Sequence, residues 1–214
     1  MPDFSIELSK IGSNVRIVCG VAEAGRGPWA GPVVAGAAVL DPDTLPADLA
    51  ADLDDSKKLK ADKREALLVR LQDVGAVLGV GIASAQEIDE INILQATMKA
   101  MTRAMTDLSS KLGKPPDFAL IDGNRVPDGL SCAAEAVVKG DGRSLSIAAA
   151  SIVAKVTRDR MMAELDAQYP GYGWASNAGY GTKAHQEGLK ALGITPEHRK
   201  SFAPIRKMLS PADS

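Results

Sequence analysis

Three acidic residues follow apolar, strand-like segments at widely separated places in this sequence. Glu23 follows a β-branched run, Asp122 ends the segment FALID, and Asp141 follows the lysine and glycine of VKGD. Because strand ends in a sheet covered by helices converge on one edge, these carboxylates could share a cleft. Such a cluster needs a cation to offset its repulsion, and hard oxygen ligands without histidine or cysteine favour Mg²⁺ or Mn²⁺. Two such ions can hold the attacking and leaving oxygens of a phosphodiester. The spacing is equally compatible with three acids that lie in separate, unrelated turns, since Asp-Gly is a common turn pair.

The stretch from Val15 to Leu40 predicts a β-hairpin with a functional tip. Two apolar runs flank a polar turn that contains Gly25, Arg26 and Gly27, with Glu23 expected as an exposed carboxylate before it. The glycines leave backbone N–H groups uncovered, so a phosphate or sugar can approach closely. The arginine adds a bidentate donor for phosphate. The alternative interpretation is an ordinary tight turn at a sheet edge.

Hydrophobic periodicity predicts the elements that would position these residues. Helix caps are expected at Asp62, Asn92 and Thr182. The Met- and Leu-rich stripe after Asn92 fits a helix packed on a sheet better than a coiled coil, because it lasts barely three heptads. We therefore predict an α/β fold, a mixed sheet with helices on both faces and a C-terminal helical extension. The expected elements after the hairpin are a loop at 41–51, a helix at 62–74, a strand at 77–82, a helix at 92–112, strands at 118–121 and 132–138, a helix at 146–168, a loop at 169–180, a helix at 182–192 and a last helix from 195.

Composition indicates one soluble domain. The chain has 214 residues, 45% of them hydrophobic and 24% charged, with a net charge of −2. We expect a single domain over 1–214, with the sheet and core helices at about 15–168 and a C-terminal loop and helices at about 169–209. No signal peptide or membrane-length apolar run is evident, so a cytoplasmic location and no membrane partner are expected.

Cysteine, histidine and the basic residues of the C-terminal part are less informative. Cys19 and Cys132 fit small buried residues in strands and lack the spacing of a metal site or disulfide framework. His185 and His198 are expected as surface or capping residues. From Gly181 onward, six basic residues face three acidic ones, which permits a local phosphate-binding face.

Several long motifs resemble bacterial ribonuclease HII, in order and over nearly the whole chain. They are VAEAGRGPWAGPVV, DDSKKL, NILQATMKAM, LIDGN, VKGD, AAASIVAKVTRDR, GYGTKAH and HRKSF. The resemblance implies a ribonuclease H-like fold, a Mn²⁺ or Mg²⁺ cofactor and a monomer. It also implies cleavage of the RNA strand of RNA–DNA hybrids, and nicking on the 5′ side of ribonucleotides embedded in duplex DNA to leave a 3′-hydroxyl. Ribonuclease HIII carries an extra N-terminal domain, and the short leader before Val15 favours HII.

The resemblance also implies roles for individual residues. Glu23, Asp122 and Asp141 match three of the four acids that hold metal and act in catalysis. The remaining position holds Ala22 where the family has aspartate, so we expect an inactive or strongly impaired enzyme that still binds substrate. The expected substrate contacts are Gly25, Arg26 and Gly27 at the ribose 2′-hydroxyl, Tyr180 stacked on the following deoxyribose, and Lys57, Lys58 and Lys183 at phosphates.

Two other functions remain open. The first is a natural, non-catalytic binder of RNA–DNA junctions, for which alanine at position 22 would be the native residue. The second is a nucleotide-binding α/β domain that uses GRGPWAG as a phosphate loop. The turn lacks the Lys-Ser/Thr pair of a P-loop, and a strand follows it where both known phosphate-binding fingerprints require a helix.

Overall fold

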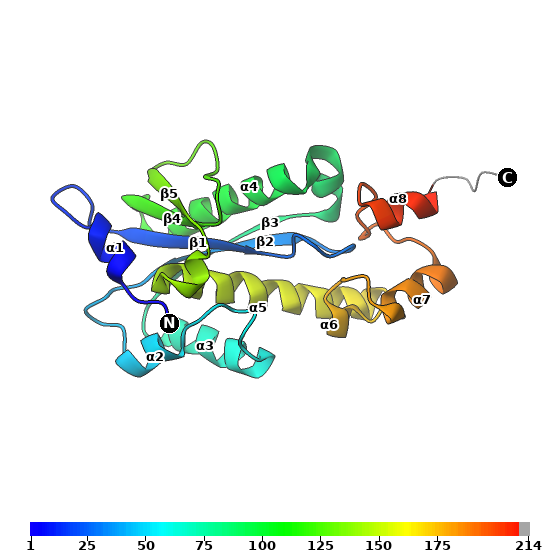
Figure 1. Cartoon of the computed structure of the whole chain (residues 1–214), viewed down its shortest axis with the longest axis horizontal. Helices are drawn as coiled ribbons and strands as arrows, with labels where there is room; N and C mark the ends of the chain where they lie inside the picture. The colour runs from blue at the N-terminus through cyan, green and yellow to red at the C-terminus, as the bar shows by residue number, and fades with distance from the viewer. Residues whose placement is uncertain (210–214) are drawn as a thin grey trace.

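The computed structural model describes residues 1–209 and contains one five-stranded sheet covered by helices (Figure 1). The strands are β1 Val18–Ala24, β2 Val33–Val39, β3 Val77–Ala83, β4 Phe118–Asp122 and β5 Ala133–Val137. The helices are α1 Ser5–Lys10, α2 Ala47–Asp52, α3 Ala61–Asp73, α4 Ala85–Leu112, α5 Leu145–Gln168, α6 Trp174–Asn177, α7 Lys183–Leu192 and α8 Ala203–Leu209, with a 3₁₀ turn η1 at Gly140–Gly142. This is the predicted mixed α/β architecture.

The strand order β3-β2-β1-β4-β5 explains how distant acids meet. β1 pairs antiparallel with β2 in the predicted hairpin, whereas β1, β4 and β5 run parallel. Their carboxyl ends therefore lie at the same edge of the sheet. Val21 is level with Ile121, and Asp122 is level with Val137, so the residues that follow each strand become neighbours.

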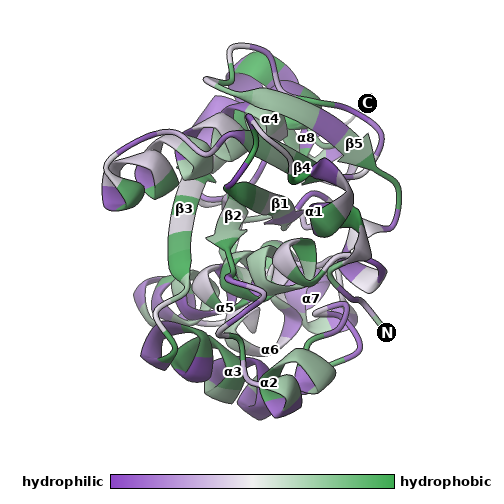
Figure 2. Cartoon of the chain, turned by 90° about the vertical axis from the view of Figure 1, so that its left-hand side faces the viewer, coloured by the Kyte–Doolittle hydropathy of each residue, from purple (hydrophilic) through white to green (hydrophobic). Residues whose placement is uncertain are grey.

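Glycine lets a helix approach the sheet closely on each face (Figure 2). A Cβ on Gly36 of β2 would lie 2.2 Å from the Ala150 carbonyl oxygen of α5. On the other face, a Cβ on Gly81 of β3 would lie 2.0 Å from the Ala100 carbonyl oxygen of α4. Small residues on both helices complete these contacts, so the alanine-rich start of α5 is buried as its sequence predicts.

Helix α4 is longer than its sequence predicts and is broken where we expected its start. Asn92 has φ 67° and ψ 163°, and its side-chain oxygen accepts hydrogen bonds from the N–H groups of Leu94 and Gln95. Asn92 therefore caps the second half, as predicted. The first half begins with a capping box between Ser84 and Glu87 that the prediction missed. The stripe of α4 packs on the sheet, which supports the helix-on-sheet interpretation.

Some local predictions are wrong. Helix α3 begins after Lys60, so Asp62 lies inside it and is not its cap. The predicted loop at 41–51 contains most of α2, and the predicted loop at 169–180 contains all of α6. The sequence at 195–197 forms a turn, and the last helix starts at Ala203. Cys132 is half-buried and lies just before β5, whereas Cys19 is buried in β1 as predicted.

The C-terminal helices α6, α7 and α8 lie at the end of the sheet where the β1–β2 hairpin points (Figure 1). They enclose a small aromatic core centred on Trp174, which packs against Tyr172. Thr182 caps α7 through its side-chain oxygen, as predicted. Among residues 1–209, no helix combines the length and apolarity needed to cross a membrane.

Candidate active site

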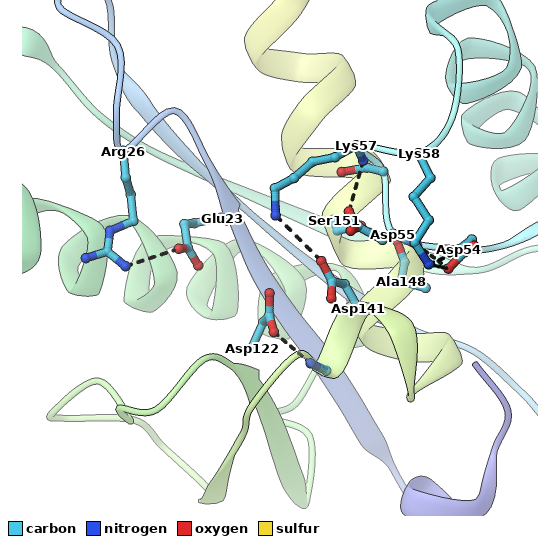
Figure 3. A network of polar contacts seen from close by, with 12 residues as sticks. Glu23, Arg26, Asp54, Asp55, Lys57, Lys58, Asp122, Asp141, Ala148 and Ser151 are labelled. Carbon is cyan, nitrogen blue, oxygen red and sulfur yellow. Dashed lines mark hydrogen bonds and ion pairs between the residues drawn. The ribbon is translucent and has the colours of Figure 1, made fainter. Parts of the chain in front are cut away.

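The structure brings Glu23, Asp122 and Asp141 to one edge of the sheet (Figure 3). Glu23 is the penultimate residue of β1, Asp122 ends β4, and Asp141 lies in the turn before α5. The Gly140 N–H donates to the Asp122 carboxylate over 2.9 Å, which joins the end of β4 to the turn that carries Asp141. The carboxylates thus gather as the strand-end argument predicts.

Burial raises the pKa of all three acids, and repulsion from Asp122 adds to it for Glu23 and Asp141. Burial is the largest cause that raises the pKa of Glu23, and the nearby Asp122 charge raises it further. The pKa of Asp122 is also raised by burial, against the opposing hydrogen bond from Gly140. Burial, followed by repulsion from Asp122 and Asp55, raises the pKa of Asp141. Glu23 was expected to be exposed, but its side chain is only 18% exposed.

Lys57 is the cation that faces all three acids. Its ammonium nitrogen lies 3.8 Å from an Asp141 oxygen, and its charge lowers the pKa of each of the three carboxyls. Asp55, on the same loop, also faces Asp141 and was not predicted from the sequence. Arg64 of α3 holds this loop by donating to the carbonyl oxygens of Ser56 and Leu59.

The other lysines differ in their placement. Lys58 lines the same cleft as Lys57 and Asp141, and its ammonium group pairs with Asp54 at 2.9 Å. Lys183 instead begins α7, where its 90% exposed side chain lies 3.8 Å from Glu187. Lys183 is not among the residues that line the clefts around the acids.

The glycine-rich turn forms one wall of a cleft of about 200 Å³ next to Glu23. Gly25 has φ +96°, and a Cβ there would lie 2.0 Å from the Arg158 Nε, so this position requires glycine. A Cβ on Gly27 would lie 3.3 Å from the ring of Tyr180, which is half-exposed across the same cleft. Arg26 extends from the turn and lies 3.6 Å from Glu23.

Two buried arginines hold the loop between β1 and β2, and neither was predicted from the sequence. Arg158 donates to the carbonyl oxygens of Ala30, Pro32 and Ala178. Arg199 donates to those of Gly25, Arg26, Gly31 and Pro32. Burial lowers the pKa of Arg158 to about 10 and that of Arg199 to about 9, values at which both remain charged at neutral pH. Arg199 is one of the six basic residues counted from Gly181 onward toward a phosphate-binding face, but it is fully buried.

His185 and His198 were expected as surface or capping residues, and both are fully buried. The His185 Nδ1 lies 3.0 Å from the Tyr180 carbonyl oxygen, and its Nε2 accepts from the Trp174 indole. The His198 Nε2 lies 3.0 Å from the His185 Nε2, and its Nδ1 accepts from the Thr195 N–H. This pattern assigns a neutral state to both rings. The pair ties the Tyr180 segment to the C-terminal core.

Ala22 lies on the opposite side of β1 from Glu23. Its methyl group is buried in the apolar cluster that faces α5, whereas Glu23 lines a cleft with residues of α4. Consecutive side chains of a strand point to opposite faces of the sheet, so positions 22 and 23 at the end of β1 lie on different faces. Within residues 1–209, no group of three His, Cys, Asp or Glu side chains is arranged to hold a metal ion.

The model of the family described as "Ribonuclease HII" matches residues 19–205. The chain belongs to the ribonuclease HII family. A ribonuclease HII of Magnetococcus marinus is 55% identical over 210 residues, which cover 97% of this chain and 95% of the relative. A ribonuclease HII of Parvibaculum lavamentivorans is 56% identical over 211 residues, which cover 99% of this chain and 75% of the relative. Family membership places this chain among the ribonuclease HII endonucleases.

Solved structures agree with the ribonuclease H-like fold. The ribonuclease H2 of Pyrococcus horikoshii superposes with a TM-score of 0.71 at 30% identity, over 90% of this chain and 97% of that chain. A structure described as Bst-RNase HIII in complex with Mn²⁺ has a TM-score of 0.71 at 19% identity, over 94% and 71% of the two chains, and supports the fold alone.

Proposed function

We propose that the fold is that of an endonuclease that cleaves the RNA strand of RNA–DNA hybrids. It also nicks duplex DNA on the 5′ side of an embedded ribonucleotide and leaves a 3′-hydroxyl. The observation that carries this proposal is the meeting of Glu23, Asp122 and Asp141 beside the Gly25–Gly27 turn, in a chain of the ribonuclease HII family. The acids would act on the phosphodiester while the turn recognises the sugar that precedes it.

The donor set suits Mn²⁺ or Mg²⁺ in its chemistry. Carboxylate oxygens are hard ligands, and a cation would offset the repulsion that raises the pKa values of these acids. We assign Glu23, Asp122 and Asp141 as ligands whose side chains would draw closer around an ion than they lie in the structure, and position 22 as the place of a further one. When bound, such an ion supplies Lewis acidity and a more acidic water. Lys57 meanwhile balances part of the negative charge when no ion is bound.

Substrate recognition is assigned to the cleft wall and its rim. Gly25, Arg26 and Gly27 would meet the 2′-hydroxyl that distinguishes RNA from DNA. Tyr180, half-exposed beside Gly27, would stack on the next sugar. Arg26 together with Lys57, Lys58 and Lys183 would contact phosphates, and Lys183 would do so at a greater distance from the acids.

Alanine at position 22 leads us to propose that this chain is catalytically impaired. A unit charge about 4 Å from another interacts by roughly 4 kcal/mol at an effective dielectric constant near 20, and a divalent ion roughly doubles that. If half of this energy is lost in the transition state, the rate falls by about three orders of magnitude, at about 1.4 kcal/mol per tenfold. The side chain at position 22 points to the face of the sheet that α5 covers. A carboxylate there would lie on the same face as the turn before α5, which carries Asp141.

The deciding experiment restores the acid. Ala22→Asp is assayed with Mn²⁺ or Mg²⁺ on a duplex that contains one ribonucleotide, and cleavage should rise by about three orders of magnitude. Ala22→Asn is the matched control, since it has nearly the same shape without the charge, and it should leave the rate low. An Ala22→Asp protein that folds and binds the duplex but does not cleave it would defeat the proposed activity.

A non-catalytic binder of RNA–DNA junctions is the second candidate. The burial of the Ala22 methyl in an apolar cluster favours it, because an apolar side chain suits those surroundings. The residue that the natural gene encodes at position 22 distinguishes the two functions: aspartate indicates the enzyme and alanine the binder. We also propose a single monomeric domain, which light scattering after size exclusion tests by the mass of the free chain.

A further inference from the structure

The buried guanidinium of Arg199 lies directly beneath the turn that faces the cleft. Its two terminal nitrogens donate to the carbonyl oxygens of Gly25 at 2.6 Å and Arg26 at 3.0 Å. Its Nε donates to the Gly31 carbonyl oxygen at 2.9 Å, and a fourth contact reaches that of Pro32 at 3.1 Å. The guanidinium therefore connects the two ends of the loop between β1 and β2.

These contacts determine where the neighbouring N–H groups point. In a trans peptide the carbonyl oxygen of one residue and the N–H of the next point in opposite directions, and residues 1–209 contain no cis peptide bond. Because the carbonyls of Gly25 and Arg26 point inward to a fully buried side chain, the N–H groups of Arg26 and Gly27 point outward. No protein acceptor for these two N–H groups is recorded in the described part of the chain.

We propose that Arg199 is a positioning residue that makes the turn selective for a ribose hydroxyl. It holds two adjacent amide donors toward the cleft, at the spacing of successive backbone N–H groups that bind an oxygen. This inference rests on the proposed function, since it assigns the chemical cause of selectivity at the same site. Arg199 does not touch the substrate and acts through the Gly25 and Arg26 peptide units.

Arginine suits this position for a reason that lysine does not share. A planar guanidinium presents several donors in a fixed fork, so one side chain can hold carbonyls of four residues. In the described part of the chain, Arg199 has no carboxylate within salt-bridge distance, and its ring contact is Phe202, at 5.1 Å. Its donors are therefore all committed to the loop between β1 and β2, at the turn and at the two residues just before β2.

The test compares binding to two duplexes of the same sequence, one with a single ribonucleotide and one of DNA alone. The unmodified chain should prefer the ribonucleotide-containing duplex. Arg199→Lys should reduce that preference about tenfold and change the affinity for DNA alone by less than about twofold. Leu108→Ala is the control for general destabilisation, since Leu108 is buried on α4, on the opposite face of the sheet from α5. Its preference should equal that of the unmodified chain.

The outcomes separate this inference from the proposed function. An unmodified chain without any preference contradicts the proposed function. A preference that survives in folded Arg199→Lys overturns the positioning role alone. If Arg199→Lys does not fold, amide hydrogen exchange of the unmodified chain provides the test. The N–H groups of Arg26 and Gly27 should exchange fast in the free chain and become protected by the ribonucleotide duplex but not by DNA alone. Equal exchange with both duplexes would refute the inference.

Discussion

The buried pair of His185 and His198 makes the stability of this protein depend on pH in a defined direction. Burial, together with the neighbouring His185, lowers the pKa of His198 from 6.5 to about 4, and burial also lowers the pKa of His185. The fold therefore favours the neutral rings, and the unfolded chain binds protons more readily. This stabilisation is fully present above about pH 6.5 and is lost as the pH falls toward about 4.

The shift sets the size of the effect. One pKa unit corresponds to about 1.4 kcal/mol, so moving the His198 pKa from 6.5 to about 4 is equivalent to roughly 3 kcal/mol. Protonation places a hydrogen on the ring nitrogens that now accept, the His198 Nδ1 facing the Thr195 N–H and the His185 Nε2 facing the Trp174 indole. Acidification should therefore break these contacts and loosen the aromatic core to which His185 ties the Tyr180 segment, before the whole chain unfolds. Substrate affinity should consequently fall over the same pH range.

The assay is urea unfolding followed by tryptophan fluorescence at several pH values, since Trp174 is fully buried beside the pair. His198→Gln is the matched variant, because its side-chain N–H can donate to His185 and its oxygen can accept from Thr195, yet it does not titrate. Comparing the two proteins cancels the acids whose raised pKa values act in the opposite sense, among them Glu197. Parallel loss of stability in both proteins between about pH 7 and pH 4 would refute the reasoning.

Three further predictions concern the candidate active site. Mn²⁺ at about 100 times its dissociation constant should raise the free energy of unfolding by about 2.7 kcal/mol at neutral pH. The rise should be much smaller near pH 4, where carboxyls with raised pKa values are protonated. An equal rise at both pH values, measured by calorimetry, would argue against carboxylate ligands. Lys57→Ala should weaken hybrid binding, measured by fluorescence anisotropy, and lower the slope of log affinity against log salt concentration by about one. Lys183→Ala should change the affinity and this slope less, and the reverse order would contradict the cleft assignment. Gly25→Ala, whose Cβ would lie 2.0 Å from the Arg158 Nε, should lower the melting temperature far more than Gly113→Ala, where φ is also positive but the space is open; equal shifts would show that the contact yields.

The sequence by itself determined the features that depend on local periodicity and on short motifs. Apolar runs and caps predicted the hairpin, the helix after Asn92 and the start of α7. Asp122 and Asp141 were identified because acids that follow parallel strands must reach the same sheet edge. Side-chain alternation and capping act over a few residues, so one segment contains the information they need.

Only the tertiary structure decided which polar side chains are buried and what they hold. Arg199 and His198 occur in a short, polar C-terminal stretch whose sequence is typical of an exposed segment. Both are nevertheless fully buried, Arg199 against the hairpin and His198 in the aromatic core. Glu23 became largely buried for the same reason, since Asp122 and α4 approach it from distant parts of the chain. Burial of a polar group depends on partners far away in sequence that satisfy its hydrogen bonds, and local spacing carries no record of those partners.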